Sequence, residues 1–257
     1  MSILKMVLGK YIKIPKLENF KEVVFVGPHA DDIEFGAGGT VSKLRDNGAH
    51  IHFIIVTDGA SGTKNKDDDP MILKKTREDE SNKSASFLGV ETVDFLEFED
   101  GGSYTKEDVI KKIAPLILKY NPEIIFSTDP NLKTECHPDH IKVGEAIKEL
   151  TQLIGYPHSL KRRGVDVSEY NVFPRNIYLA QYFTDSPNKR VKISKKNWKD
   201  KEKSIRMHES QIDESIGLLI TYFNAKSIES GIKHFKGRSE DFKVYHPMMQ
   251  HVYSEGF

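Results

Sequence analysis

The stretch that decides the fold is Val23-Val24-Phe25-Val26-Gly27-Pro28-His29-Ala30-Asp31-Asp32-Ile33-Glu34, followed by Gly36-Ala37-Gly38-Gly39-Thr40. Its apolar beginning has the pattern of a buried strand, and residues 40–47 have the spaced apolar side chains of a helix. The charged residues therefore lie at a strand-to-helix junction. In an open α/β sheet, ligands bind just beyond the carboxyl ends of the strands. This stretch thus predicts both a sheet and a ligand site at its edge.

The rest of the first half repeats the alternation of strand and helix. Short β-branched or aromatic runs recur at His52-Phe53-Ile54-Ile55-Val56, Val93-Asp94-Phe95-Leu96 and Glu123-Ile124-Ile125-Phe126. Residues 71–88 and 106–120 between them have the length and periodicity of crossover helices. This alternation predicts an α/β fold, with a mostly parallel sheet flanked by helices.

The C-terminal portion is less regular. Beyond residue 150 we expect a strand at 176–183 and helices at 198–207 and 214–226. A chain of 257 residues can bury a large core in one domain. We therefore expect a single catalytic domain over residues 1–257, with its core at about 22–211 and a C-terminal helical extension at 212–257.

A second polar cluster, Cys136-His137-Pro138-Asp139-His140, also follows a strand pattern and precedes a helix, at 141–150. Neutral imidazole and carboxylate suit zinc, and a catalytic zinc keeps three protein ligands and one open position. His29 and Asp32, three residues apart, together with His140 would complete that count. Each cluster alone has a simpler explanation, because paired histidines are often surface residues and consecutive aspartates often cap helices. The two clusters together favour a metal site.

Composition excludes several classes of protein. Lys plus Arg and Asp plus Glu both number 38, so no overall positive field exists to attract nucleic acid. Cys136 is the only cysteine, which excludes an internal disulfide and a cysteine metal cluster. We find no secretory signal pattern and no apolar run of the ~20 residues that span a bilayer. We expect a cytoplasmic protein with no membrane span and no nucleic-acid partner.

Two further patterns have ordinary explanations. The glycines at 36, 38 and 39 do not fit the G-x-G-x-x-G spacing of a dinucleotide site, so we expect them to allow close packing of a helix on the sheet. The lysine-rich residues 192–203 contain interleaved acidic residues, which is typical of a solvated helix face.

The chain resembles the LmbE-like (PIG-L) superfamily of zinc-dependent de-N-acetylases, and within it the archaeal diacetylchitobiose deacetylase type. The similarity runs in order from about residue 23 to 211. It rests on these motifs: His29-Ala30-Asp31-Asp32-Ile33-Glu34, Val56-Thr57-Asp58-Gly59, Arg77-Glu78-Asp79-Glu80, Leu88-Gly89-Val90, His137-Pro138-Asp139-His140 and His208-Glu209-Ser210-Gln211. One departure is Ala30, where the family commonly has a proline that would stiffen the loop by fixing φ.

This resemblance implies a Rossmann-like sheet with one Zn²⁺ per chain at its carboxyl edge. The implied metal ligands are His29, Asp32 and His140. The other implied roles are Asp31 as general base, His137 as the group that stabilises the oxyanion or protonates the leaving amine, Asp139 as the carboxylate that orients a neighbouring imidazole, and Arg77 as a contact for substrate hydroxyls.

The expected function is removal of the N-acetyl group from a small sugar that contains N-acetylglucosamine, such as diacetylchitobiose, giving acetate and a free amino sugar. One alternative is a metal hydrolase of the same fold that acts on a different amide or on a thiol-conjugated sugar. A non-catalytic sugar-binding protein would require damage to the site, and none of the expected residues is missing. A homo-oligomer is left open, as is a contribution of His246 or His251 to their own or a neighbouring site.

Overall fold

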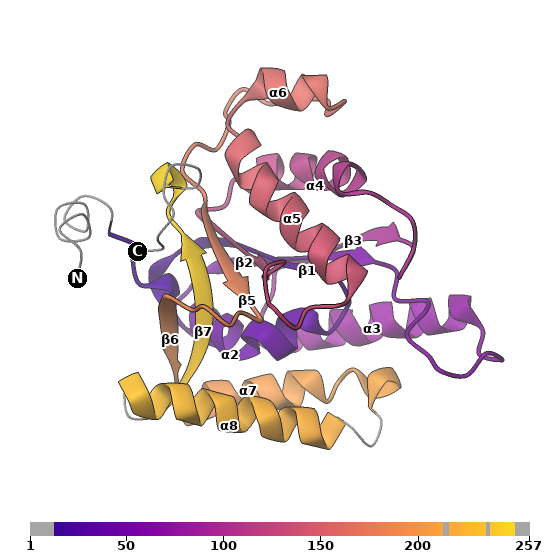
Figure 1. Ribbon diagram of the computed structural model, residues 1–257, viewed down its shortest axis with the longest axis vertical. Coiled ribbons are helices and arrows are strands. Elements are labelled where there is room, and N and C mark those ends of the chain that lie inside the picture. The colour runs from indigo at the N-terminus through magenta and orange to yellow at the C-terminus, as the bar shows by residue number, and fades with distance from the viewer. Residues whose placement is uncertain (1–12, 213–215, 235–236, 250–257) are drawn as a thin grey trace.

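The computed structural model describes residues 13–212, 216–234 and 237–249. Its centre is a 7-stranded sheet in the order β3-β2-β1-β4-β5-β7-β6 (Figure 1). The parallel strands are β1 (Glu22–Gly27), β2 (His50–Thr57), β3 (Thr92–Phe98), β4 (Ile124–Thr128) and β5 (Tyr178–Tyr182). Strand β7 (Arg238–Tyr245) runs antiparallel to its neighbours β5 and β6 (Lys189–Ile193). The expected α/β fold with a mostly parallel sheet is confirmed.

Helices cover both faces of the sheet (Figure 1). One face carries α2 (Asp32–Asp46), α3 (Pro70–Leu88), α7 (Lys195–Ile205) and α8 (Ile216–His234). The other carries α4 (Lys106–Tyr120) and α5 (Pro138–Leu153), with the short α6 (Pro157–Arg162) beyond α5. Among the described residues, no helix has both the length and the apolarity needed to cross a membrane.

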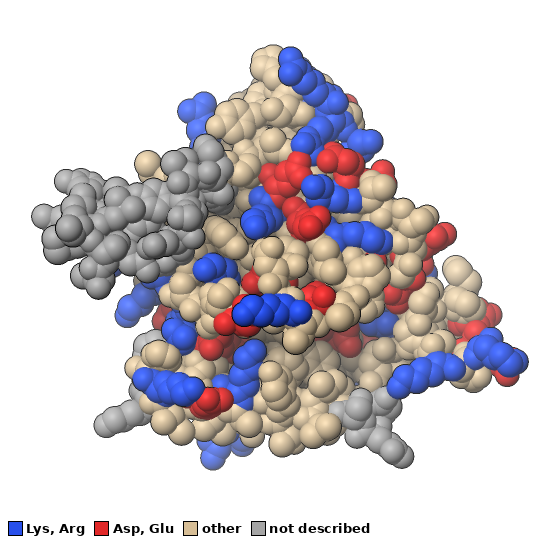
Figure 2. All heavy atoms as spheres, viewed as in Figure 1, with Lys and Arg blue, Asp and Glu red and all other residues tan. Residues whose placement is uncertain are grey.

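Side chains of β1 show how the strand period builds two cores. Val23 and Phe25 point into the apolar cluster beneath α2, whereas Val24 and Val26 point into the one beneath α4 and α5. Successive side chains of a strand face opposite sides of the sheet, and a strand covered on both faces is therefore apolar throughout. On the face seen in Figure 2, basic and acidic side chains are interspersed.

Gly36 and Gly39 of α2 allow this helix to lie close to the sheet, as expected, whereas Gly38 faces Lys201 of α7. A Cβ atom at Gly36 would lie 2.3 Å from the ring of Tyr182 on β5, and one at Gly39 would lie 2.9 Å from Ile193 on β6. The hydroxyl of Tyr182 donates a hydrogen bond to the Val26 carbonyl at 2.8 Å. Helix α2 begins at Asp32, well before residue 40, because this packing outweighs the low helix propensity of glycine.

Strands β6 and β7 were not expected from the sequence, and the C-terminal portion is therefore not purely helical. Residues 212–257, expected as a helical extension, contribute β7 to the central sheet. Its inward-facing residues include Glu240, which accepts hydrogen bonds from the backbone N–H groups of Gly39 (3.1 Å) and Thr40 (2.6 Å) and from Lys201 Nζ (2.6 Å). Because the charged Glu240 occupies a buried position in the middle of β7, the strand lacks the alternation of apolar and polar residues by which it could be predicted. That residues 1–257 form one catalytic domain stays a prediction.

Candidate active site

The two polar clusters of the sequence meet at the carboxyl edge of the sheet. The loop after β1 carries His29 and Asp31, α2 begins with Asp32, and the loop after β4 leads to His137 and His140. Because β1 and β4 are parallel neighbours, their carboxyl ends open to the same side.

His29, Asp32 and His140 form a compact group, as expected. One potential ligand atom from each lies within 4.8 Å of the others. The Asp32 carboxylate bridges the two imidazoles, with Oδ2 3.1 Å from His29 Nδ1 and Oδ1 3.3 Å from His140 Nε2. Asp32 Oδ2 also accepts the backbone N–H of His29 at 2.9 Å, which fixes the carboxylate within its own loop.

The second imidazole is held by a residue that sequence reasoning missed. Glu135 Oε2 lies 2.9 Å from His140 Nδ1, and Glu135 Oε1 accepts the backbone N–H of His137 at 2.9 Å. A carboxylate on one ring nitrogen leaves the other available as a ligand. The available signal was an acidic residue in the same loop, just before the histidine cluster.

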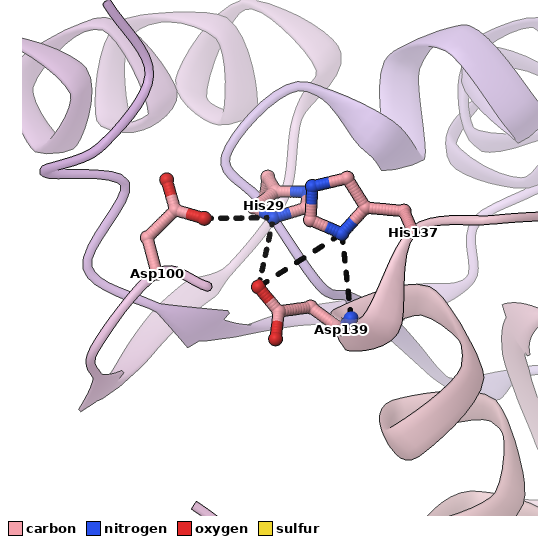
Figure 3. Close-up of side chains that lie close together, drawn as sticks. All are labelled: His29, Asp100, His137 and Asp139. Carbon is pink, nitrogen blue, oxygen red and sulfur yellow. Dashed lines mark hydrogen bonds and ion pairs between the residues drawn. The ribbon is translucent and has the colours of Figure 1, made fainter. Parts of the chain in front are cut away.

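Asp139 lies next to His29, at the start of α5 (Figure 3). Its Oδ2 is 3.4 Å from His29 Nε2 and 3.9 Å from His137 Nδ1. This buried carboxylate accepts hydrogen bonds from the Gly101 backbone N–H and the Tyr104 hydroxyl, both at 2.8 Å. The expectation that Asp139 orients a neighbouring imidazole fits this position, and the nearer imidazole is that of His29.

Asp100 is a further site residue that the sequence analysis did not single out. Its Oδ1 lies 3.2 Å from His29 Nε2 (Figure 3). Its backbone N–H donates to Asp58 Oδ1 at 3.1 Å, so the loop after β2 holds the loop after β3. The signal was an acid followed by Gly101 and Gly102, four residues after the end of a predicted strand.

Asp31 and Arg77 lie together beside this group. Asp31 occupies the N-cap position of α2 but its side chain makes no capping hydrogen bond there. The carboxylate instead lies 3.4 Å from Arg77 Nη2, and Arg77 Nη1 donates to the Gly59 carbonyl at 3.3 Å. Arg77 is only 4% exposed, so it is not an ordinary surface arginine. Its contact with substrate hydroxyls stays a prediction.

The site favours positive charge. Burial by itself lowers the pKa of His29, but hydrogen bonds to Asp100, Asp139 and Asp32 raise it to about 12. Burial also opposes the charged form of His140, whose pKa Asp32 and Glu135 nevertheless raise to about 9. His137 differs, because burial and the nearby imidazoles lower its pKa. The carboxylates thus stabilise a cation at His29 and His140.

The weaker motifs act as supports around the site. Glu34 Oε1 accepts the Ser84 hydroxyl at 2.5 Å and lies 3.2 Å from His208 Nε2. Glu80 accepts the backbone N–H and the hydroxyl of Ser210, both at 2.7 Å. Segments distant in sequence are therefore tied to α2 by buried hydrogen bonds at Glu34 and to α3 by exposed ones at Glu80.

His246 does not join the site of its own chain. Its ring lies 5.2 Å from that of Tyr178, at the start of β5 and thus at the opposite edge of the sheet. His251 lies outside the described residues.

The structure thus combines a mostly parallel α/β sheet with a group of His and Asp side chains at its carboxyl edge that could hold a metal ion. The chain belongs to the PIG-L family, described as GlcNAc-PI de-N-acetylase, whose model matches residues 24–151. The resemblance inferred from the motifs is confirmed.

Individual relatives are similar over most of the chain. Diacetylchitobiose deacetylase of Thermococcus kodakarensis is 35% identical over 201 residues, which are 76% of this chain and 72% of the relative. The structure of N,N'-diacetylchitobiose deacetylase from Pyrococcus horikoshii, complexed with its inhibitor MPG, has a TM-score of 0.85 at 28% identity and covers 98% of this chain and 93% of that one. The protein TT1542 from Thermus thermophilus shares the fold. Its TM-score is 0.69 at 22% identity, and the match covers 86% of this chain and 93% of that one.

Proposed function

We propose that this protein is a zinc-dependent hydrolase that removes the N-acetyl group from a sugar containing N-acetylglucosamine, such as diacetylchitobiose. The products are acetate and a free amino sugar. The observation that carries the proposal is the convergence of His29, Asp32 and His140 on one point, with Asp31 beside them. The similarity to diacetylchitobiose deacetylases over most of the chain favours this substrate class.

The donor set fits a divalent metal. Two imidazoles and a carboxylate are ligands that zinc accepts, and the carboxylates of Asp100 and Asp139 add negative charge next to His29. A zinc ion on His29, Asp32 and His140 would supply a Lewis acid that polarises the acetamide carbonyl and lowers the pKa of water to ~7. We expect one such ion per chain.

Asp31 is the proposed general base. Its carboxylate is free of a helix-capping role and lies beside the metal ligand Asp32 in the chain. It accepts the proton of the attacking water, while Arg77 at 3.4 Å keeps the carboxylate in place. Arg77 also presents a guanidinium that can donate hydrogen bonds to sugar hydroxyls.

His137 is the proposed donor on the other side of the reacting carbonyl. Its side chain is 44% exposed, so a substrate can reach it. A hydrogen bond from its imidazole stabilises the tetrahedral oxyanion, and its proton then passes to the leaving amine. Asp139 orients the neighbouring ring of His29.

The test is acetate release from N-acetylglucosamine, diacetylchitobiose and a thiol-conjugated acetyl sugar, with metal content measured on the same samples. We expect acetate from diacetylchitobiose, and loss of both zinc and activity in His140→Ala. His137→Ala should lower kcat and keep the tightly bound zinc. Activity on the thiol conjugate alone would favour the alternative substrate, and a fully active enzyme without metal would refute the proposal.

The remaining expectations are part of the same proposal. We propose that the enzyme acts in the cytoplasm. Its assembly into a homo-oligomer also stays a proposal, tested by the mass of the protein in solution.

A further inference from the structure

Two overlapping groups of metal-ligating side chains lie at the sheet edge. The first is His29, Asp32 and His140, and the second is His29, Asp100, His137 and Asp139 (Figure 3). In each group, the potential ligand atoms lie within 4.8 Å of one another. His29 belongs to both, with Nδ1 3.1 Å from Asp32 and Nε2 3.2 Å from Asp100.

We propose that Asp100, His137 and Asp139 form a second, weaker zinc site beside the catalytic one, and that its occupation inhibits the enzyme. The inhibition rests on the function proposed above, whereas the binding does not. Two carboxylates and an imidazole are a donor set that zinc accepts.

The Asp139 carboxylate and the backbone of Asp100 are held in place before any ion binds. Asp139 is buried and fixed by hydrogen bonds from the Gly101 backbone N–H and the Tyr104 hydroxyl, both at 2.8 Å. The Asp100 backbone N–H is anchored at 3.1 Å by Asp58 on the neighbouring loop. Preorganised carboxylates do not have to give up conformational freedom when an ion binds.

His29 makes the second site weaker than the first. A neutral imidazole has one acceptor nitrogen, so His29 can ligate only one ion. If Nδ1 ligates the first ion, Nε2 carries the proton and donates hydrogen bonds to Asp100 and Asp139. The second ion is left with three ligands and is repelled by the first ion.

Nearby cations weaken the second site further. Lys142 Nζ lies 3.5 Å from Asp139 Oδ1, and Arg77 Nη1 lies 4.0 Å from Asp100 Oδ2. These cations offset part of the negative charge that attracts a dication. We therefore expect the second ion to bind only when zinc exceeds one equivalent.

The consequence for catalysis follows from His137. Its exposed ring is accessible to an ion from solvent. His137 Nδ1 accepts the Asp139 backbone N–H at 3.3 Å, and zinc would take this lone pair instead. An imidazole that ligates zinc cannot at the same time be the imidazolium that protonates the leaving amine. Occupation of the second site therefore removes the proposed donor while the first ion stays in place.

Zinc binding to the full-length protein tests the site directly, by equilibrium dialysis and elemental analysis. We expect about two ions per chain in the wild type and about one in both His137→Ala and Asp100→Ala. The matched control is His158→Ala, which removes an exposed imidazole on α6 and should keep both ions. Circular dichroism verifies that each variant is folded, and His137→Ala removes an exposed side chain.

Two results would overturn the second site. One is a stoichiometry of one ion in the wild type up to millimolar zinc, and the other is a second ion that persists in both variants. His140→Ala should lose the tight ion, which tests the catalytic site separately.

Acetate release over the same zinc range tests the inhibition. Wild-type activity should rise with the first ion and fall at least several-fold as the second binds. Activity that stays constant while the second ion binds would refute the inhibition. A lack of acetate from every sugar would refute the proposed function and leave the binding result standing.

Discussion

Asp31 and Asp32 are adjacent and chemically identical, yet the site gives them different partners. Asp32 lies 3.1 Å from His29 Nδ1 and 3.3 Å from His140 Nε2. Asp31 lies 3.4 Å from Arg77. The substitutions Asp31→Asn and Asp32→Asn preserve size and remove one negative charge each, so any difference between them reports on role.

The expected magnitudes differ in kind. Asp31→Asn cannot accept the proton of water, and loss of general base catalysis lowers the rate by ~10²- to 10⁴-fold, or about 3 to 5 kcal/mol of barrier. Asp32→Asn replaces an anionic ligand by a neutral amide. Mutating a residue that only hydrogen-bonds to a metal ligand typically lowers metal affinity by about 10- to 100-fold. Asp32→Asn alters a proposed ligand itself, so it should lower zinc affinity by at least that much.

The assay is metal content and kcat for both variants across a zinc titration kept below the concentration that fills the second site. Asp31→Asn should retain zinc and stay slow, and Asp32→Asn should lose zinc and partly recover as zinc is added. If Asp31→Asn loses metal and Asp32→Asn keeps it, the two roles are reversed. If both retain metal and near-normal rates, the proposed site is wrong.

Three further predictions concern stability. Gly36→Ala should lower the free energy of unfolding by about 1 to 3 kcal/mol in urea, because the added Cβ would meet the ring of Tyr182. The control Gly217→Ala adds a methyl group in open space and should be neutral or stabilising. Lys201→Met should cost about 3 to 5 kcal/mol by leaving its buried carboxylate partner unpaired, and the exposed control Lys199→Met should change little. Burial lowers the pKa of His208 but its glutamate partner raises it overall, so the stability it contributes is complete below about pH 6.5 and is lost as pH rises through the raised pKa. The difference in unfolding free energy between wild type and His208→Gln should therefore shrink above that pH, and a difference that grows would contradict this.

Local sequence was sufficient for the first four strands and for the pairing of His29 with Asp32. Strand alternation and helix periodicity are short-range properties, and a separation of three residues at a helix start brings two side chains together. Parallel strands also place their carboxyl ends on one side, so His140 could be expected near His29. Strand β7 could not be recognised, because Glu240 replaces an apolar side chain and is stabilised by partners distant in sequence.

Sequence alone thus determined the α/β class and predicted the three residues, His29, Asp32 and His140, that come together at the sheet edge. The tertiary structure decided which carboxylates surround His29. Asp100 contacts it because β3, β2, β1 and β4 lie side by side, an order that local patterns do not encode. The burial of Arg77 next to Asp31 is also a tertiary feature. The sequence of α3 predicts a charged helix, but it does not predict that the loop containing Gly59 covers Arg77. Contacts between loops depend on strand order and on buried polar groups finding partners, and both are set only when the whole chain has folded.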